Sequence, residues 1–144
     1  MPQRKLREIV GDRKLLHVAP DMTVDEACQE MGKHFLTAVL VLDGGQLCGI
    51  FTKRDLLSRV VNMGLDPKTA PIADAMTANP IVMDAGRLGL EAVRAMRDEK
   101  IRHMVVSGLD GDGYGVICLG DIGGSEFAAF ENELNFENKV WEEI

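Results

Sequence analysis

An internal repeat restricts the fold of this chain more than any other feature of its sequence. The run Ala-Cys-Gln-Glu-Met at residues 27–31 recurs as Ala-Val-Arg-Ala-Met at residues 92–96. Both copies continue with a strand-like run, a turn of Gly and Asp, and a second strand, which begins at Gly49 in one copy and at Gly115 in the other and leads to Asp55 and Asp121. The offset is 65 residues at the first run and 66 at the last, so a one-residue loop insertion separates the copies.

Each copy has the pattern of a strand, a helix, two strands and a second helix. Thr23 and Glu26 have the spacing of a capping box, and the apolar residues after them recur at the intervals of an amphipathic helix. One unit of roughly 60 residues buries little apolar surface on its own. We therefore expect an α+β fold in which two βαββα repeats, residues 1–62 and 63–125, share a core.

The segment 126–144 is predicted to form an acidic helical tail. Residues 103–144 contain one Lys against nine Asp and Glu, whereas residues 1–102 are almost neutral. The larger apolar side chains of this tail form a rough stripe: Phe127, Phe130, Leu134 and Trp141. Such a stripe indicates a helix that packs on the body of the protein, on a second subunit or on a target protein.

The composition is that of a globular protein, with 46% hydrophobic and 27% charged residues. The net charge of −7 argues against nucleic acid or an anionic membrane as a partner. The apolar run at residues 38–42 is far shorter than the ~20 residues of a membrane span. No secretory signal is visible, and three cysteines are too few for a disulfide framework, so we expect a cytoplasmic protein.

Residues 49–55, Gly-Ile-Phe-Thr-Lys-Arg-Asp, resemble the signature that closes a CBS (cystathionine-β-synthase) domain: Gly, two apolar residues, Ser or Thr, two variable residues and Asp. Residues 115–121 are similar to it, with Cys118 in the place of Ser or Thr. The segments 75–80 and 101–106 also look like that family. The resemblance covers residues 4–124 in both copies, and the size is similar to that of stand-alone bacterial CBS-pair proteins.

The resemblance implies that the two repeats pack as a pseudo-two-fold CBS pair, followed here by a C-terminal helix. It also implies a homodimer that forms through helices. Members of the family bind adenosine-containing ligands such as AMP, ADP, ATP, NAD or S-adenosylmethionine in two clefts between the repeats. The function that follows from the resemblance is regulation and not catalysis.

Thr52 and Asp55 are the leading site candidates in the first copy. An Asp carboxylate can accept both hydrogens of a ribose diol, and free N–H groups at the start of a helix can face a phosphate. The same residues also have the pattern of a helix N-cap, which contributes about 0.5–2 kcal/mol, and the two roles are compatible. Lys53 and Arg54 either reach a phosphate or lie in a solvated first turn.

By the resemblance, Arg102 and His103 help to hold phosphate groups between the repeats, although His103 is equally compatible with a surface or core position. The first copy has no basic pair at the matching residues 37–38, so one copy supplies the ribose signature and the other the basic pair. Val18 and Ala19 match the strand edge that faces the adenine in the family. Otherwise, these two are apolar core residues.

Asp121 is the second ribose candidate. We expect its site to be weaker than the first or altered, because Cys118 is a poorer hydrogen-bond donor than Thr. In addition, Leu119 and Gly120 replace the basic pair of the first copy. Cys118 itself is either a redox sensor or an inert small residue.

Residues 110–121 also resemble a calcium-binding EF-hand loop, with oxygen ligands at its first and third positions and Gly at the sixth. However, Tyr114 and Cys118 occupy positions that normally bind the ion, and a strand precedes the loop where a helix is required, so we expect no metal. We also expect no catalytic residue and no obligatory cofactor. The chain has no nucleophile–base pair, no metal-ligand cluster and no Walker-type loop.

Two functions from different classes remain. The first is a sensor in which an adenine nucleotide, or another adenosine ligand of the AMP, ADP, ATP or NAD type, changes the shape of a CBS-pair homodimer and signals to an unidentified target protein. The alternative is a ligand-free dimerisation or protein-docking module that uses the helices and the acidic tail.

Overall fold

The computed structural model describes residues 4–13, 15–110, 113–124, 126, 128, 131, 132, 134 and 135. The chain forms two compact units. Unit A is Lys14–Ile81, and unit B combines Met1–Arg13 with Val82–Ile144. Phe127, Phe130 and Trp141 of the predicted tail stripe lie outside the described residues, whereas the described positions from Gly124 to Asn135 are helical.

Unit A is a four-stranded sheet with helices. In sheet order its strands are β1 (His17–Val18), β2 (Ala38–Asp43), β3 (Gln46–Thr52) and β4 (Thr77–Ala78). β1 pairs parallel with β2, and the remaining pairs are antiparallel. Its helices are α2 (Val24–Lys33), α3 (Lys53–Asp55), which continues as the π-helix η1 (Leu56–Val61), and the 3₁₀ turn η2 (Ile72–Asp74). The core is aliphatic around Phe51.

Unit B repeats this plan with a three-stranded sheet. Its strands are β5 (Val82–Asp84), β6 (His103–Leu109) and β7 (Gly113–Cys118), with β5 parallel and β7 antiparallel to the central β6. Its helices are α1 (Leu6–Val10), α4 (Gly89–Glu99) and the 3₁₀ turn η3 (Leu119–Asp121). The sequence therefore predicted the fold class correctly: the protein is α+β, with one strand–helix–strand–strand unit in each copy.

The ends of α2 and α4 explain part of the repeat. Thr23 caps α2, because its Oγ1 accepts a 3.2 Å hydrogen bond from the N–H of Glu26. Both helices then end in the same way. The N–H of Leu36 donates to the carbonyl of Met31, and the N–H of Ile101 donates to that of Met96, each over 2.9 Å. In each copy the N–H five residues after the Met satisfies a carbonyl of the last helical turn. Leu36 and Ile101 therefore occupy equivalent positions at the ends of the two helices.

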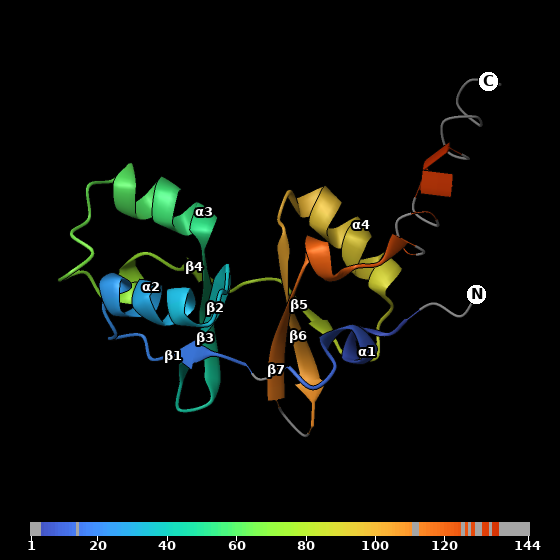
Figure 1. The fold of residues 1–144 in the computed structure, drawn as a ribbon, viewed down its shortest axis with the longest axis horizontal. Helices are drawn as coiled ribbons and strands as arrows, with labels where there is room; N and C mark the ends of the chain where they lie inside the picture. Colours follow the sequence, from blue (N-terminus) through green and yellow to red (C-terminus); the bar gives the residue numbers. More distant parts are fainter. Residues whose placement is uncertain are drawn as a thin grey trace. The chain divides into compact units, whose positions relative to one another are not determined.

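The short segments that precede each copy pack on the other copy. We call residues 4–13 leader 1 and residues 72–78 leader 2. Leader 1 pairs with unit B, for example through a 2.8 Å hydrogen bond from the N–H of Leu6 to the carbonyl of Arg87. Figure 1 shows its helix α1, in blue, beside the orange strands β6 and β7. Leader 2 pairs with unit A, where the N–H of Ile72 donates to the carbonyl of Met22 over 2.7 Å.

This exchange of leaders means that the compact units differ from the sequence repeats. Residues 1–62 and 63–125 remain the predicted repeats along the chain, but leader 1 belongs to the compact unit of the second copy. The hydrophobic effect accounts for the arrangement, because Leu6, Ile9 and Val10 are buried against the apolar side chains of unit B. Among the described residues, none of the helices has the length and apolarity that crossing a membrane requires.

Candidate functional site

Asp55 lies at the turn from strand to helix in unit A. β3 ends at Thr52, and the chain enters α3 through a reciprocal capping box. The N–H of Thr52 donates to Asp55 Oδ2 over 2.9 Å, and the Thr52 hydroxyl donates to the same oxygen over 3.1 Å. In return, Thr52 Oγ1 accepts from the N–H of Asp55 over 3.4 Å. The helix-cap interpretation of these two residues is therefore present in the structure.

The second carboxylate oxygen of Asp55 also has partners. Thr77 of leader 2 donates its hydroxyl to Oδ1 over 2.8 Å, and Arg59 Nε lies 3.4 Å from the same atom. The side chain of Asp55 is only 7% exposed. A carboxylate has roughly four acceptor positions, so all of them are occupied by groups of unit A. A ligand can bind to Asp55 only by replacing Thr77 or Arg59.

Lys53 and Arg54 follow Thr52 at the start of the helix, and both are exposed. The backbone N–H of Lys53 donates to the carbonyl of Thr37 over 3.2 Å, which ties the helix start to the beginning of β2. Val18 and Ala19 lie further along the sheet. Thr52 pairs with Ala38 on one side of β2, and Val18 pairs with Val41 on the other side, so they are offset by about 10 Å along β2 and by a further two strand spacings, about 10 Å, across the sheet. Val18 is buried in the core, whereas Ala19 is exposed.

Asp121 has the equivalent position in unit B, but its carboxylate is more open. Its Oδ2 accepts a 2.8 Å hydrogen bond from the N–H of Cys118 and lies 3.1 Å from Arg13 Nη1 of leader 1. No N–H or O–H group of a described residue donates to its other oxygen. The side chain of Asp121 is 24% exposed, more than that of Asp55.

The ionised form of Asp121 is favoured. Burial opposes ionisation, but the hydrogen bonds from Cys118 and the pairing with Arg13 outweigh it and lower the pKa of Asp121 below its usual value. The Cys118 contact that the geometry shows is the one from its backbone N–H, over 2.8 Å. Cysteine in the place of Thr is therefore compatible with the same capping geometry, since the backbone N–H makes the stronger contact.

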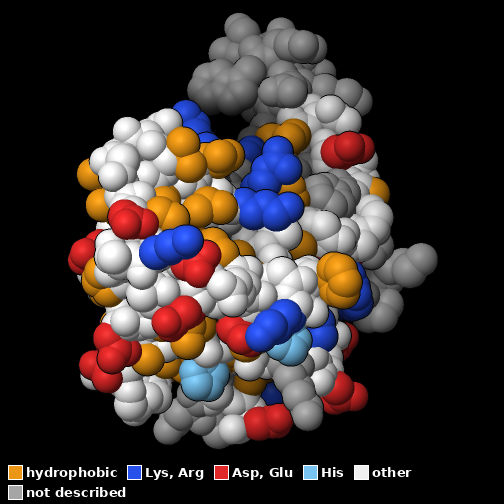
Figure 2. Space-filling model, turned by 60° about the vertical axis from the view of Figure 1, so that its left-hand side comes forward, with side chains coloured by type: hydrophobic (Ala, Val, Ile, Leu, Met, Phe, Trp, Pro, Cys, Tyr) orange, Lys and Arg blue, Asp and Glu red, His pale blue; other side chains and the backbone are white. Residues whose placement is uncertain are grey.

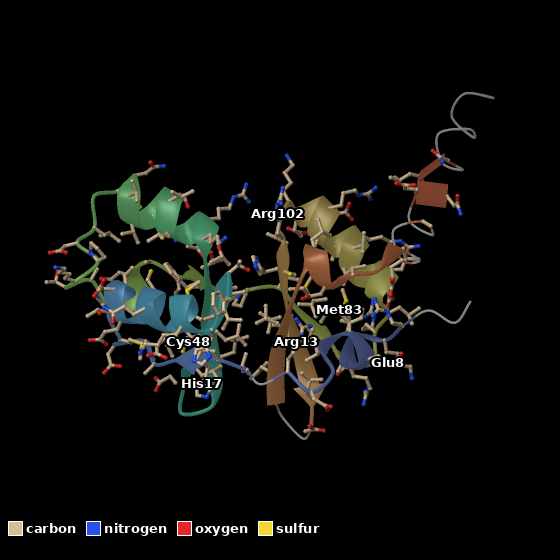
Figure 3. All side chains as sticks on the ribbon, in the orientation of Figure 1. Glu8, Arg13, His17, Cys48, Met83 and Arg102 are labelled. Carbon is tan, nitrogen blue, oxygen red and sulfur yellow. The ribbon has the colours of Figure 1, made fainter. Side chains whose placement is uncertain are left out.

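Arg102 and His103 lie at the start of β6, at the same end of the sheet as Cys118. His103 pairs with Cys118 across the two strands, and the N–H of Leu119 donates to the carbonyl of Arg102 over 2.9 Å. The side chain of Arg102 is exposed and extends beyond the end of the sheet (Figure 3). The predicted basic pair and Asp121 therefore belong to one unit.

Two glycines that open the signatures, Gly49 and Gly115, allow the leaders to approach. A Cβ on Gly49 would lie 2.6 Å from the Thr77 carbonyl oxygen of leader 2. A Cβ on Gly115 would lie 3.3 Å from Val10 Cγ1 of leader 1 and 2.7 Å from Leu109 Cδ1. Sequence reasoning found these glycines but missed Thr77 and the residues of leader 1 that contact them, because the leaders are remote in sequence from the signatures.

The structure gives no support for a metal centre in the part of the chain that it describes. No three His, Cys, Asp or Glu side chains come together there as a metal site would require. Residues 111–112 of the loop that resembles an EF-hand lie outside the described residues. Asp121, the last position of that loop, is instead paired with Arg13 and Cys118.

Known proteins share both the sequence pattern and the fold. CBS domain-containing protein CBSCBSPB1 of Arabidopsis thaliana is 35% identical over 94 residues, which are 65% of this chain and only 17% of that protein. The CBS domain protein PAE2072 from Pyrobaculum aerophilum, solved with AMP, has a TM-score of 0.78 at 21% identity, covering 90% of this chain and 99% of that one. The CBS domain pair of protein MJ0100, solved with 5-methylthioadenosine and S-adenosyl-L-methionine, has a TM-score of 0.72 at 19% identity, covering 83% and 93%.

The CBS domain family matches the chain twice, at residues 6–62 and 72–122. Each match begins in a leader and extends past the signature aspartate of its copy, so it follows the sequence repeat and not the compact unit. With two matches that cover most of its length, this chain belongs to the CBS-domain family as a tandem pair.

Proposed function

We propose that this CBS pair is a regulatory module that binds an adenosine-containing ligand through the carboxylates of Asp55 and Asp121. The observation that carries the proposal is the repeated geometry: each carboxylate caps the turn after a strand and accepts the backbone N–H three residues earlier. Ribose hydroxyls are suitable donors for such carboxylates. Related folds have been solved with AMP and with S-adenosyl-L-methionine, which supports this class of ligand.

The two carboxylates differ in what a ligand must displace. At Asp121 one oxygen accepts no N–H or O–H hydrogen bond from the described residues, so a ribose hydroxyl can bind there without breaking such a contact. At Asp55 a ribose must exchange with the hydroxyl of Thr77 or with Arg59. We therefore propose that a ligand reaches Asp121 more easily than Asp55. The presence of Cys118 in the place of Thr had suggested the opposite, namely that the Asp121 site is the weaker one.

Other predicted contacts complete the proposal. Lys53 and Arg54 are exposed directly after β3, and Arg102 is exposed directly before β6. These three are the proposed phosphate contacts, together with the half-buried His103. Val18 and Ala19 remain predicted adenine contacts. Because β2 lies between β1 and β3, an adenosine that contacts both Thr52 and these two residues has to extend across β2.

We also propose that the module is a homodimer that signals to a target protein. The helix η1 that follows Asp55 exposes the apolar side chains of Leu57 and Val61, which are 63% and 64% exposed, and Met63 is exposed in the turn after it. Figure 2 brings unit A forward and shows hydrophobic side chains gathered on the upper part of this face. Exposed apolar side chains on one helix favour association. The same residues favour the second candidate function, a docking module that acts without a ligand.

Thermal melting of the full chain with AMP, ADP, ATP, NAD and S-adenosylmethionine tests the proposal. A ligand at about 100 times its Kd adds roughly 2.7 kcal/mol of stability, which corresponds to a rise in Tm of about 5–10 °C. Asp121→Asn and Asp55→Asn should each reduce the shift. The matched control is Asp74→Asn, which removes the same charge from an exposed position in η2 and should leave the shift unchanged.

A rise in Tm with one ligand that both site variants reduce supports the sensor. A rise that neither variant changes would contradict the proposed site. No rise with any ligand at millimolar concentration would leave the ligand-free docking module as the better account.

A further inference from the structure

We propose that Arg13 selects the ligand of the Asp121 site by holding a phosphate, so that this site takes an anionic adenine nucleotide in preference to uncharged or cationic adenosine derivatives. The proposal rests on the function proposed above. It adds the chemical class of the ligand at one of the two carboxylates and assigns a role to a residue of leader 1.

The guanidinium of Arg13 is held in a fixed position by the end of α1. Its Nε donates to the carbonyl of Val10 and its Nη2 to the carbonyl of Ile9, both over 3.1 Å. These carbonyls belong to the last turn of the helix, where no later helical N–H can reach them. Arg13 therefore caps α1, and its charge is positioned before any ligand arrives.

Arg13 retains hydrogen-bonding capacity in this arrangement. A guanidinium has five N–H donors, and three of its contacts, with Val10, Ile9 and Asp121, are accounted for. The remaining two donors have no acceptor among the described residues, and the side chain is 48% exposed. Paired N–H donors on a planar, permanently charged group match the oxygens of a phosphate.

Asp121 and Arg13 together form a complementary pair of binding groups. The carboxylate is ionised and has one oxygen that receives no N–H or O–H hydrogen bond, and Arg13 Nη1 lies 3.1 Å from its other oxygen. A ligand that carries hydroxyl donors and a phosphate can satisfy both groups without breaking the ion pair. In Figure 3 Arg13 and Arg102 lie in different parts of unit B, so Arg13 supplies a cation in addition to the predicted basic pair.

At the Asp55 site the arginine beside the carboxylate comes from the helix and not from the leader, because Arg59 Nε lies 3.4 Å from Asp55 Oδ1. There the leader residue is Thr77, whose neutral hydroxyl donates to the carboxylate over 2.8 Å. A hydroxyl has a single donor, which Asp55 already accepts. The leader therefore adds a cation at Asp121 alone: Asp121 with Arg13 favours a phosphate, whereas a sulfonium cation such as that of S-adenosylmethionine is repelled by the guanidinium.

Calorimetric titration of the full chain with AMP and with adenosine tests this proposal. Arg13→Gln removes the charge and should weaken AMP binding by about tenfold or more, while adenosine affinity changes by less than about twofold. Arg13→Lys keeps the charge but not the paired geometry and should have an intermediate effect on AMP. The control is Arg7→Gln, an exposed arginine of the same leader, which should change neither affinity.

Equal losses for AMP and adenosine in Arg13→Gln would mean that Arg13 acts only as the cap of α1, and this outcome overturns the proposal. Unchanged AMP binding in both Arg13 variants also overturns it, even if Asp121→Asn abolishes binding and the proposed function stands. No binding of either compound by the unmodified chain overturns both proposals. Melting curves identify a variant that fails to fold, and Arg13→Lys then decides the outcome.

Discussion

Replacing Gly49 with alanine should destabilise unit A, because the backbone of leader 2 passes directly over this residue. A Cβ at Gly49 would stand 2.6 Å from both the Thr77 carbonyl oxygen and Met76 Sδ, whereas ordinary contacts begin at 3.4 Å. The Met76 side chain can move away. The Thr77 carbonyl is backbone, and β4 is fixed by its pairing with β3, so the strand itself must shift.

The expected loss follows from two opposing terms. Forcing an extra methyl group into a packed site costs about 1–3 kcal/mol. Alanine also restricts the unfolded chain, which returns about 0.4–1 kcal/mol. The net loss is therefore about 1–2 kcal/mol, or a fall in Tm of about 3–6 °C for a chain of this size. Displacing β4 also moves the Thr77 hydroxyl away from Asp55, and this hydroxyl is one of the groups that a ligand at Asp55 has to replace.

Gly32→Ala is the matched control, because it makes the same chemical change in α2 where a Cβ would meet nothing within 4 Å. Alanine is the better helix former by up to about 1 kcal/mol, so this variant should melt about 2–3 °C above the unmodified chain. Scanning calorimetry of both variants measures the difference. A Gly49→Ala variant that melts at or above the unmodified chain would refute the close approach of leader 2.

Two further predictions concern the ion pairs of leader 1. Arg4 Nε lies 2.7 Å from Glu126 Oε1, and the Glu126 side chain is buried. Arg4→Ala removes the guanidinium beside that buried carboxylate and should therefore lower the Tm more than Glu126→Gln does; the reverse order in calorimetry would contradict the burial of Glu126. The second prediction is a pH dependence at Asp121, whose folded-state pKa lies below the ordinary value of 3.8. The stability from its pairing is complete above that value and is lost as the pH falls through the folded-state pKa. The stability difference between the unmodified chain and Asp121→Asn, measured by denaturant titration, should be full at pH 6 and shrink below about pH 4; a constant difference would exclude the ion pair.

The repeat in the sequence was sufficient to predict the fold class because each copy carries its own local signals. Thr23 caps α2, as its spacing to Glu26 predicted. The other half of a capping box, a hydrogen bond from the Thr23 N–H to the Glu26 carboxylate, is not among the hydrogen bonds of the described residues. The strands begin earlier than predicted: β3 starts at Gln46, and β7 starts at Gly113. The signatures start at Gly49 and Gly115, inside these strands, and continue past their last residues. The pattern therefore predicted where each strand ends but not where it begins.

The exchange of the leaders could not be predicted from the repeat. Two copies with the same pattern offer a leader two equivalent surfaces, and only packing decides between them. For the same reason the sequence identified Thr52, Asp55 and Asp121 but missed Thr77 and Arg13, which reach the two carboxylates from the leaders. A local motif describes residues close in sequence, whereas these contacts join distant segments of the chain.

Observation of backbone amides during a titration with AMP tests the central claim most directly. The N–H groups of Thr52 and Cys118 donate to the two signature carboxylates, so nuclear magnetic resonance of these amides reports on each site separately. Ribose binding should shift one or both signals progressively to a plateau, with Cys118 responding at the lower AMP concentration. Unchanged signals at both residues in millimolar AMP, or saturable shifts confined to other parts of the chain, would contradict the proposed site.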